Sequence, residues 1–230
     1  QMRFGEEDVD RPIPLFLHDQ IGDGKPSSTK LSVNENLSLA WADQDGGQLL
    51  EGHPTMPFGV CGRSSQWNFL HHNSHRYYGM GEKLFDLERS GIRTKFWNTD
   101  VFADFHGAVH SQHEPDPMYV SVPYLIRKMC DTYIGILIDN PRCTFMATAP
   151  TTCIEGLQSV SGDSDKLMLT LGAESGAPNL FLIYGPSLPE LTRKFQSLVG
   201  RTPRPPAWAL GYHQCRWGYK SESDLKYLDE

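Results

Sequence analysis

The sequence predicts a mainly β protein built as a β-sandwich. Short apolar segments recur along its 230 residues between turns rich in glycine, proline, asparagine and aspartate, and most have the length of a strand. Aromatic residues make up 11% of the chain and 21 residues are glycine, which suits a β protein with many loops. Regularly spaced strands without helices between them are typical of two packed antiparallel sheets.

The first clear strands form a predicted hairpin. Leu37 to Trp41 alternates apolar and polar residues, Asp43 to Gly47 is a turn, and Gln48 to Glu51 returns as the partner strand. Residues 1–36 are rich in proline and polar turn residues, so we expect loop there with at most two short strands. Further strands are expected at residues 66–70, 76–78, 119–126, 133–138, 143–148, 166–171 and 179–184.

One helix is expected in this part of the chain, from Pro189 to Val199. Its apolar residues recur at helical spacing, at Leu191, Phe195, Leu198 and Val199. Ser187 is a suitable cap for the free N–H groups of the first turn, and Gly200 ends the helix.

The proline-rich segment 201–206 marks a domain boundary, because such a segment forms a stiff, extended spacer. No other segment of the chain marks a comparable boundary. We therefore expect one domain over residues 1–204 and the start of a second domain over residues 205–230.

The second domain is expected to begin with a strand and a helix. The apolar run from Ala207 leads into a strand that ends at Trp217, and Ser221 with Asp224 resembles a capping box at the start of the helix. A single strand and its helix cannot bury their apolar faces. Residues 205–230 therefore look like the first part of a larger α/β domain, truncated at Glu230.

The composition argues against several classes of partner and site. The net charge is −7 without a run of like charges, which gives no electrostatic footprint for a nucleic acid or an anionic membrane surface. No apolar run approaches the roughly 18 residues that a membrane span needs. The five cysteines are odd in number and form no CxxC pair, which favours free thiols in a reducing compartment such as the cytoplasm over a disulfide framework or zinc ribbon.

Three motifs in order resemble those of glycoside hydrolase family 31, the α-glucosidase and α-xylosidase family. The first is Tyr78-Gly79-Met80-Gly81-Glu82-Lys83. The second is Phe96-Trp97-Asn98-Thr99-Asp100, followed by Asp116 to Pro123. The third is the string from Pro206 to Tyr219, which resembles the first strand of the family's barrel. The resemblance covers roughly residues 38–230.

The resemblance implies both a fold and an activity. The expected fold is a mutarotase-like β-sandwich followed by the start of a (β/α)8 TIM barrel. The longer protein would be a retaining glycoside hydrolase that hydrolyses α-glycosidic bonds, with an α-linked glucoside or oligosaccharide as substrate and with no cofactor. The rest of the catalytic barrel would be the structural partner of these residues.

Two residues are predicted to bind substrate. On composition alone, Asp100 is a turn former and Trp217 is a core residue at the domain junction. In the resembled family, an aspartate in the Asp100 position hydrogen-bonds sugar hydroxyls from a loop of the sandwich, and a carboxylate suits this task because it accepts strong hydrogen bonds. An aromatic ring in the Trp217 position packs against a sugar ring at a barrel strand end.

Other polar residues are interpreted as structural. His106, His110 and His113 have helical spacing but lie in a predicted loop, and the resemblance implies no metal there. His71, His72 and His75 are interpreted as turn and strand-edge residues, and Glu82 as structural. We predict no catalytic residue here, because a retaining glycosidase needs two carboxylates about 5–5.5 Å apart and the family places both on later barrel strands. The 230 residues alone are thus predicted to be inactive.

Two other functions remain open from the sequence. The chain could be a free-standing sandwich that binds carbohydrate through exposed aromatic side chains, although residues 207–230 have no use in such a module. It could also be an aldose-epimerase-like enzyme of the same sandwich type. That reaction needs a histidine and a carboxylate converging on the concave face, and no recognisable motif places a histidine there.

Overall fold

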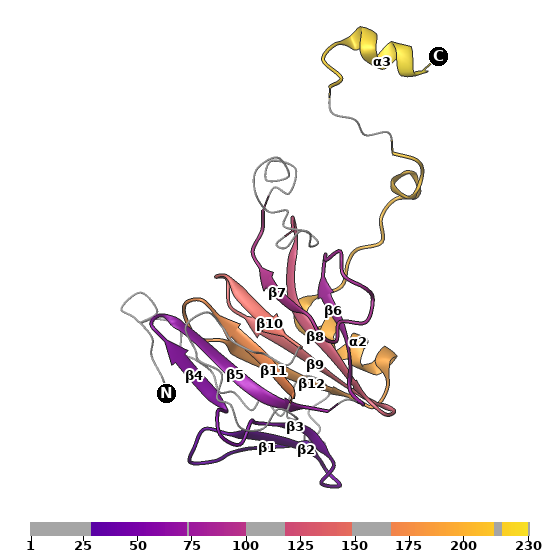
Figure 1. Cartoon of the computed structure of the whole chain (residues 1–230). Coiled ribbons are helices and arrows are strands. Elements are labelled where there is room, and N and C mark those ends of the chain that lie inside the picture. The colour runs from indigo at the N-terminus through magenta and orange to yellow at the C-terminus, as the bar shows by residue number, and fades with distance from the viewer. Residues whose placement is uncertain (1–28, 73, 100–117, 149–166, 214–217, 230) are drawn as a thin grey trace. The chain divides into compact units, whose positions relative to one another are not determined.

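The computed structural model describes residues 29–72, 74–99, 118–148, 167–213 and 218–229. The chain divides into two compact units, residues 1–199 and residues 200–230. The first unit carries the described strands, and the second carries two short helical segments (Figure 1). The domain boundary between residues 204 and 205 remains a prediction.

The described strands form three antiparallel sheets. The first sheet consists of β1 (Thr29–Val33), β2 (Leu39–Asp43) and β3 (Gln48–Glu51), in that order. The second has the order β4 (Phe58–Cys61), β5 (Ser64–His71), β11 (Leu167–Ala173), β10 (Thr144–Ala147) and β7 (Arg93–Phe96). The third has the order β12 (Asn179–Gly185), β9 (Thr132–Asp139), β8 (Ser121–Met129) and β6 (Arg76–Gly81).

The five-stranded and four-stranded sheets pack face to face (Figure 1), so the predicted β-sandwich is confirmed. Their inner faces share one apolar core, which the three-stranded sheet extends. Its buried members include Trp41, Leu50, Phe69, Leu125, Ile134, Ile136, Met146 and Leu171. Burial of each such aliphatic or aromatic side chain contributes about 1.5–3 kcal/mol, so this shared core is the main source of stability.

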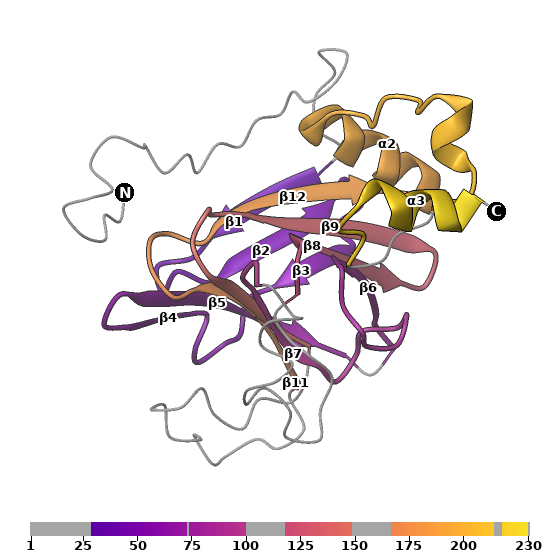
Figure 2. The same ribbon diagram turned by 90° about the horizontal axis from the view of Figure 1, so that it is seen from above.

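The four-stranded sheet is apolar on both faces because α2 (Leu188–Val199) covers the outer one. Successive strand residues point to opposite faces. The isoleucines of β9 that face the sandwich core are Ile134, Ile136 and Ile138. Leu137 faces outward, where Leu191 of α2 is fully buried and Phe195 stacks on Tyr124 with ring centroids 3.8 Å apart. Figure 2 shows α2 lying along β12 and β9.

The structure confirms most of the local predictions in the first unit. The hairpin is β2 and β3, closed by Asp43, whose carboxylate accepts the backbone N–H groups of Asp45 and Gly47. Ser187 Oγ accepts the N–H of Glu190 at 3.4 Å at the start of α2. The strands β4 and β7 were not predicted, because each is only four residues long and its pattern is too short to distinguish from loop.

The prediction of a strand from Ala207 is wrong for the residues that the structure describes there. Ala207–Leu210 form a 3₁₀ helix instead, and none of the four is buried. Ala209 donates its N–H to the carbonyl of Pro206, a local bond of the kind that closes a tight turn. A strand needs a neighbour to satisfy its backbone groups, and no described strand pairs with this run.

The predicted C-terminal helix is confirmed as α3 (Glu222–Asp229). Ser221 Oγ accepts the N–H of Asp224 at 3.2 Å, and the Asp224 carboxylate accepts the N–H of Ser221 at 3.0 Å. This reciprocal pair is a capping box with aspartate in place of the usual glutamate. None of the described helices is long and apolar enough to cross a membrane. The three described cysteines, Cys61, Cys130 and Cys143, are free thiols.

Candidate functional site

The predicted substrate-binding segment leaves the sandwich between β7 and β8. Asp100 and Trp217, the two residues expected to contact substrate, both lie outside the described residues, and so do His106, His110 and His113. The roles of Asp100 and Trp217 therefore stay predictions. The structure describes the two chain segments from which residues 100–117 emerge, and the surface beside them.

These two segments form a stem that is fastened by one main-chain hydrogen bond and one hydrogen bond to a side chain. Thr99 donates its N–H to the carbonyl of Met118 at 3.0 Å, and Met118 is buried. Two residues later, Val120 donates its N–H to Glu82 Oε2 at 2.8 Å. Glu82 thus has the structural role expected from the sequence. The stem therefore holds together the chain just before and just after residues 100–117.

An irregular stretch of β6 brings Glu82 to the stem. Gly79, Met80 and Gly81 all have positive φ, at 89°, 66° and 68°, and the register between β6 and β8 shifts there. A β-carbon on Gly79 would lie 2.7 Å from the carbonyl oxygen of Tyr124, so only glycine fits this close approach. The motif that carries the family resemblance therefore bends the edge strand and directs Glu82 toward Val120.

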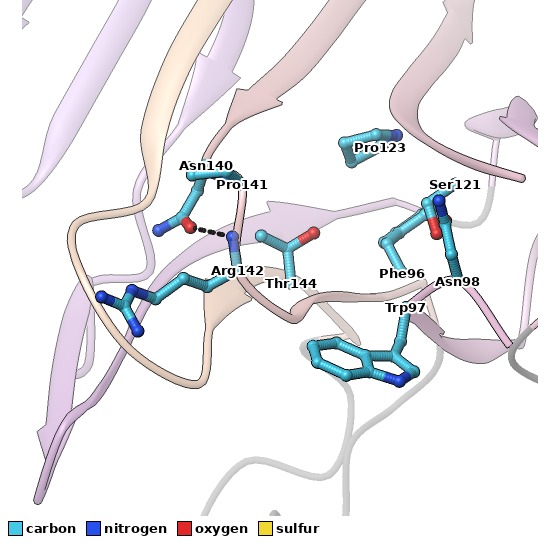
Figure 3. A pocket seen from close by; sticks show the side chains of 9 residues that line it. All are labelled: Phe96, Trp97, Asn98, Ser121, Pro123, Asn140, Pro141, Arg142 and Thr144. Atoms are coloured by element: carbon cyan, nitrogen blue, oxygen red, sulfur yellow. Dashed lines mark hydrogen bonds between the residues drawn. The ribbon is translucent and has the colours of Figure 1, made fainter.

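A hollow of about 350 Å³ lies beside the stem. It is formed where β7 ends, β8 begins and β9 connects to β10. Figure 3 shows the Trp97 ring on one side of the hollow, Asn140 and Arg142 on another, and Thr144 between them. The lining residues are Phe96, Trp97, Asn98, Ser121, Pro123, Asn140, Pro141, Arg142 and Thr144. The hollow combines one open aromatic face with amide and hydroxyl side chains.

The wall opposite Trp97 is held by Asn140. Its amide donates to the carbonyls of Ser175 and Ala177 at 3.1 and 3.0 Å, and its Oδ1 accepts the N–H of Arg142 at 2.8 Å. The first two bonds fasten the β9–β10 connection to the segment between β11 and β12, and the third lies within the connection itself. The hollow therefore has a fixed shape on this side.

A second polar group lies at the ends of β5, β6 and β8. His71 and His75 are both buried, His71 Nδ1 is 2.8 Å from the Tyr77 hydroxyl, and Arg127 Nη2 is 3.3 Å from His75 Nε2. Arg127 is only 4% exposed, and its Nε and Nη1 atoms have no hydrogen-bond partner among the residues that the structure describes. The interpretation of these histidines as turn and strand-edge residues missed their burial, which a short polar stretch of sequence does not reveal.

His75 in this group is held in its neutral state. Burial and the positive charge of Arg127 lower the pKa of His75 from 6.5 to about 3. The geometry agrees, because the N–H of His72 points at His75 Nδ1 while the guanidinium of Arg127 points at Nε2. A neutral imidazole can accept a hydrogen bond at one of these nitrogens, whereas a protonated imidazole would place an N–H against both donors. Burial also lowers the pKa of His71 and raises that of Tyr77 to about 12.

The buried histidines do not form an epimerase site. Such a site requires a histidine and a carboxylate that both reach a bound sugar. Glu88, the nearby carboxylate, accepts the N–H groups of Tyr77 and Ser90 and the Ser90 hydroxyl, and His71 and His75 are each 8% exposed. No group of three or more potential metal ligands occurs among the described residues.

Two family models and several curated proteins match this chain. The family model "Glycosyl hydrolase 31 N-terminal galactose mutarotase-like domain" matches residues 23–146, and "Glycosyl hydrolases family 31 TIM-barrel domain" matches residues 202–230. Alpha-glucosidase 2 of Bacillus thermoamyloliquefaciens is 31% identical over 79% of this chain and 21% of its own length. Neutral alpha-glucosidase AB of Mus musculus is 28% identical over 91% of this chain and 22% of its own length.

Solved structures share the fold. A GH31 dextranase of Flavobacterium johnsoniae, solved with isomaltotriose, superposes with a TM-score of 0.69 at 23% identity, over 88% of this chain and 22% of that one. The catalytic subunit of ER glucosidase II gives a TM-score of 0.69 at 19% identity, over 88% and 26% of the two chains. The chain thus spans about a fifth of the length of the curated relatives that it matches.

Proposed function

Because this chain belongs to glycoside hydrolase family 31, we propose that it forms part of a retaining, α-glucosidase-like enzyme that hydrolyses α-glycosidic bonds. The relatives named alpha-glucosidase support this class of reaction. The substrate would be an α-linked glucoside or oligosaccharide, and the rest of the catalytic barrel would be the structural partner of residues 205–230.

The observation that carries the proposal is the fastened stem below residues 100–117. A loop that supplies one hydrogen bond to a substrate must leave its domain at a fixed place, since a misplacement of about 1 Å can cost roughly 100-fold in rate. The bonds from Thr99 to Met118 and from Val120 to Glu82 provide that constraint. Asp100 follows Thr99 directly in the sequence.

The catalytic carboxylates and the predicted substrate-binding residues would come from different parts of the enzyme. Retention requires a nucleophile and an acid/base about 5–5.5 Å apart on opposite sides of the scissile bond. We place both on barrel strands that follow Glu230 in the longer enzyme. The sandwich would contribute Asp100 as a hydrogen-bond acceptor for sugar hydroxyls, and the barrel start would contribute the Trp217 ring. Neither role needs a metal or a cofactor.

The experiment is a comparison of two proteins. The longer protein that contains the barrel is expected to hydrolyse an aryl α-glucoside, and NMR of the first product is expected to show a retained α-anomer. The 230-residue chain alone is expected to give no hydrolysis above a mock preparation. Inversion at the anomeric carbon, or hydrolysis by the short chain, would contradict the proposal.

A further inference from the structure

We propose that the hollow beside the stem is an accessory binding site for an α-glucan oligosaccharide, formed by Trp97, Asn98, Ser121 and Arg142. It is composed of described residues only and does not include Asp100. The choice of an α-linked glucan rests on the proposed function, whereas the existence of a sugar site rests on the geometry of the hollow.

Trp97 is exposed, unlike its neighbour Phe96. Phe96 and Trp97 point in opposite directions, so Phe96 is 3% exposed in the sandwich core while Trp97 is 54% exposed. Trp97 is one of the side chains that line the hollow (Figure 3). An indole offers a large apolar face with little rotamer freedom, and the C–H face of a pyranose ring is flat and apolar in the same way.

Several polar residues line the hollow beside the Trp97 ring. Asn98 is exposed, and its amide has no hydrogen-bond partner among the described residues, so it can both donate to and accept from sugar hydroxyls. Ser121, which carries a hydroxyl, and Arg142 line the same hollow. A sugar needs such a combination, because each of its rings presents apolar C–H groups and a rim of hydroxyls that donate and accept.

The hollow has the size and the rigidity of a ligand pocket. Its volume of about 350 Å³ lies at the lower end of the range for ligand pockets, roughly 300–1,000 Å³. Asn140 fastens one wall, and the ladder pair of Thr144 with Phe96 fixes the floor. A site that is already ordered loses less conformational entropy when a ligand binds.

The charges near the hollow favour an uncharged ligand. Lys95 Nζ is paired with Glu174 Oε1 at 2.8 Å, and Lys83 Nζ lies 5.0 Å from the centroid of the Phe96 ring. Arg142 is thus the one cation that lines the hollow, and no anion-binding cluster of several cations surrounds it among the described residues. A phosphorylated ligand would need more positive charge than this.

The test is a titration of the 230-residue chain by NMR, followed through the indole N–H signals of its tryptophans. Maltotriose and isomaltotriose are the probes, and cellotriose and inorganic phosphate are the comparison ligands. We expect a saturable shift of the Trp97 signal with at least one of the α-linked probes and weaker binding of cellotriose. Equal binding of cellotriose, or a stronger response to phosphate, would overturn the assignment to α-glucans.

Variants make the test specific. Trp97→Ala is expected to weaken binding about tenfold or more, and Trp97→Phe, which keeps a flat ring, is expected to stay within about threefold of the original affinity. Trp208→Ala is the matched control, because Trp208 is 75% exposed but belongs to the other unit. Equal affinity in Trp97→Ala and the original chain would overturn the proposal. Circular dichroism checks that each variant is folded.

The outcome is independent of the outcome for catalysis. Hydrolysis by the longer protein with no binding at Trp97 would rule out the accessory site and leave the proposed enzyme activity intact. Binding at Trp97 without any hydrolysis by the longer protein would leave a sugar site and overturn the proposed enzyme activity.

Discussion

Glu82 Oε2 accepts the backbone N–H of Val120 at 2.8 Å, across 38 residues of sequence. This bond links the bent end of β6 to the segment that leads into β8. It stands two residues from the pair of Thr99 and Met118, so a side chain and a main-chain bond together fasten the base of residues 100–117.

Glu82→Ala should loosen this base more than it lowers global stability. Glu82 is exposed, so the loss of its hydrogen bond should reduce the free energy of unfolding by only about 1 kcal/mol. The amide of Val120 should exchange with solvent several-fold faster, as measured by hydrogen exchange with NMR. Asp86→Ala, which removes another exposed carboxylate close by, is the control. Unchanged exchange at Val120 would show that Glu82 does not hold the stem.

Gly79→Ala should be strongly destabilising. Alanine at a φ of 89° costs about 1–2 kcal/mol, and the new methyl group would also press on the Tyr124 carbonyl oxygen 2.7 Å away. The free energy of unfolding should therefore fall by about 2–5 kcal/mol in urea titrations. Gly62→Ala is the matched control, because Gly62 also has positive φ but has no atom within 4 Å of the added carbon. Equal losses in both variants would rule out the close approach as the cause.

His75 should make the sandwich sensitive to acid. The pKa of His75 is about 3 in the folded chain and 6.5 in the unfolded chain. Between pH 3 and pH 6.5 the unfolded chain therefore binds a proton at His75 that the folded chain does not bind. The stabilisation from neutral His75 is complete above pH 6.5 and is lost as the pH falls toward 3, by at most about 1.4 kcal/mol per pH unit.

The variant His75→Asn measures this contribution. Asparagine does not titrate, and its side-chain oxygen can still accept a hydrogen bond from Arg127. The difference in unfolding free energy between pH 7 and pH 4 should be smaller in His75→Asn than in the original chain. His213→Asn, at an exposed histidine of the other unit, should leave the difference unchanged. A pH dependence identical in all three proteins would contradict the role of His75.

Asp100→Ala, made in the longer enzyme, should lower kcat/KM without lowering stability. The substitution would remove a charge-assisted hydrogen bond to substrate worth roughly 1.5–3 kcal/mol, so kcat/KM should fall by about ten- to two-hundred-fold. Trp217→Ala should lower both kcat/KM and the melting temperature, because a ring at a domain junction also fills core volume. A lower melting temperature with unchanged kcat/KM in Asp100→Ala would show that this residue is only a turn former.

The local elements of this protein could be predicted from the sequence because their signals lie within a few residues. The alternation in β2 and β3, the carboxylate of Asp43 in the turn, and the caps at Ser187 and Ser221 each act over two to five positions. The family resemblance rests on three ordered motifs, and in the one from Tyr78 to Lys83 the glycines Gly79 and Gly81 have positive φ and close neighbours.

The arrangement of the candidate site was decided by tertiary structure. The hollow joins Trp97, Ser121 and Arg142 from three strand ends, and His75 meets Arg127 across 52 residues of sequence. No local pattern records such meetings, because they depend on which strands pair and which faces are buried.

The run from Ala207 also shows that a local sequence pattern does not decide whether a strand forms. Its apolar residues suit a strand, but a strand exists only where a neighbour accepts its backbone hydrogen bonds. With no described strand beside it, the run forms local 3₁₀ bonds instead. Sequence by itself determined where most of the strands and helices of the first unit lie along the chain, and the family. The tertiary structure alone decided sheet partners, burial of polar groups and the shape of the hollow, because these depend on contacts between distant residues.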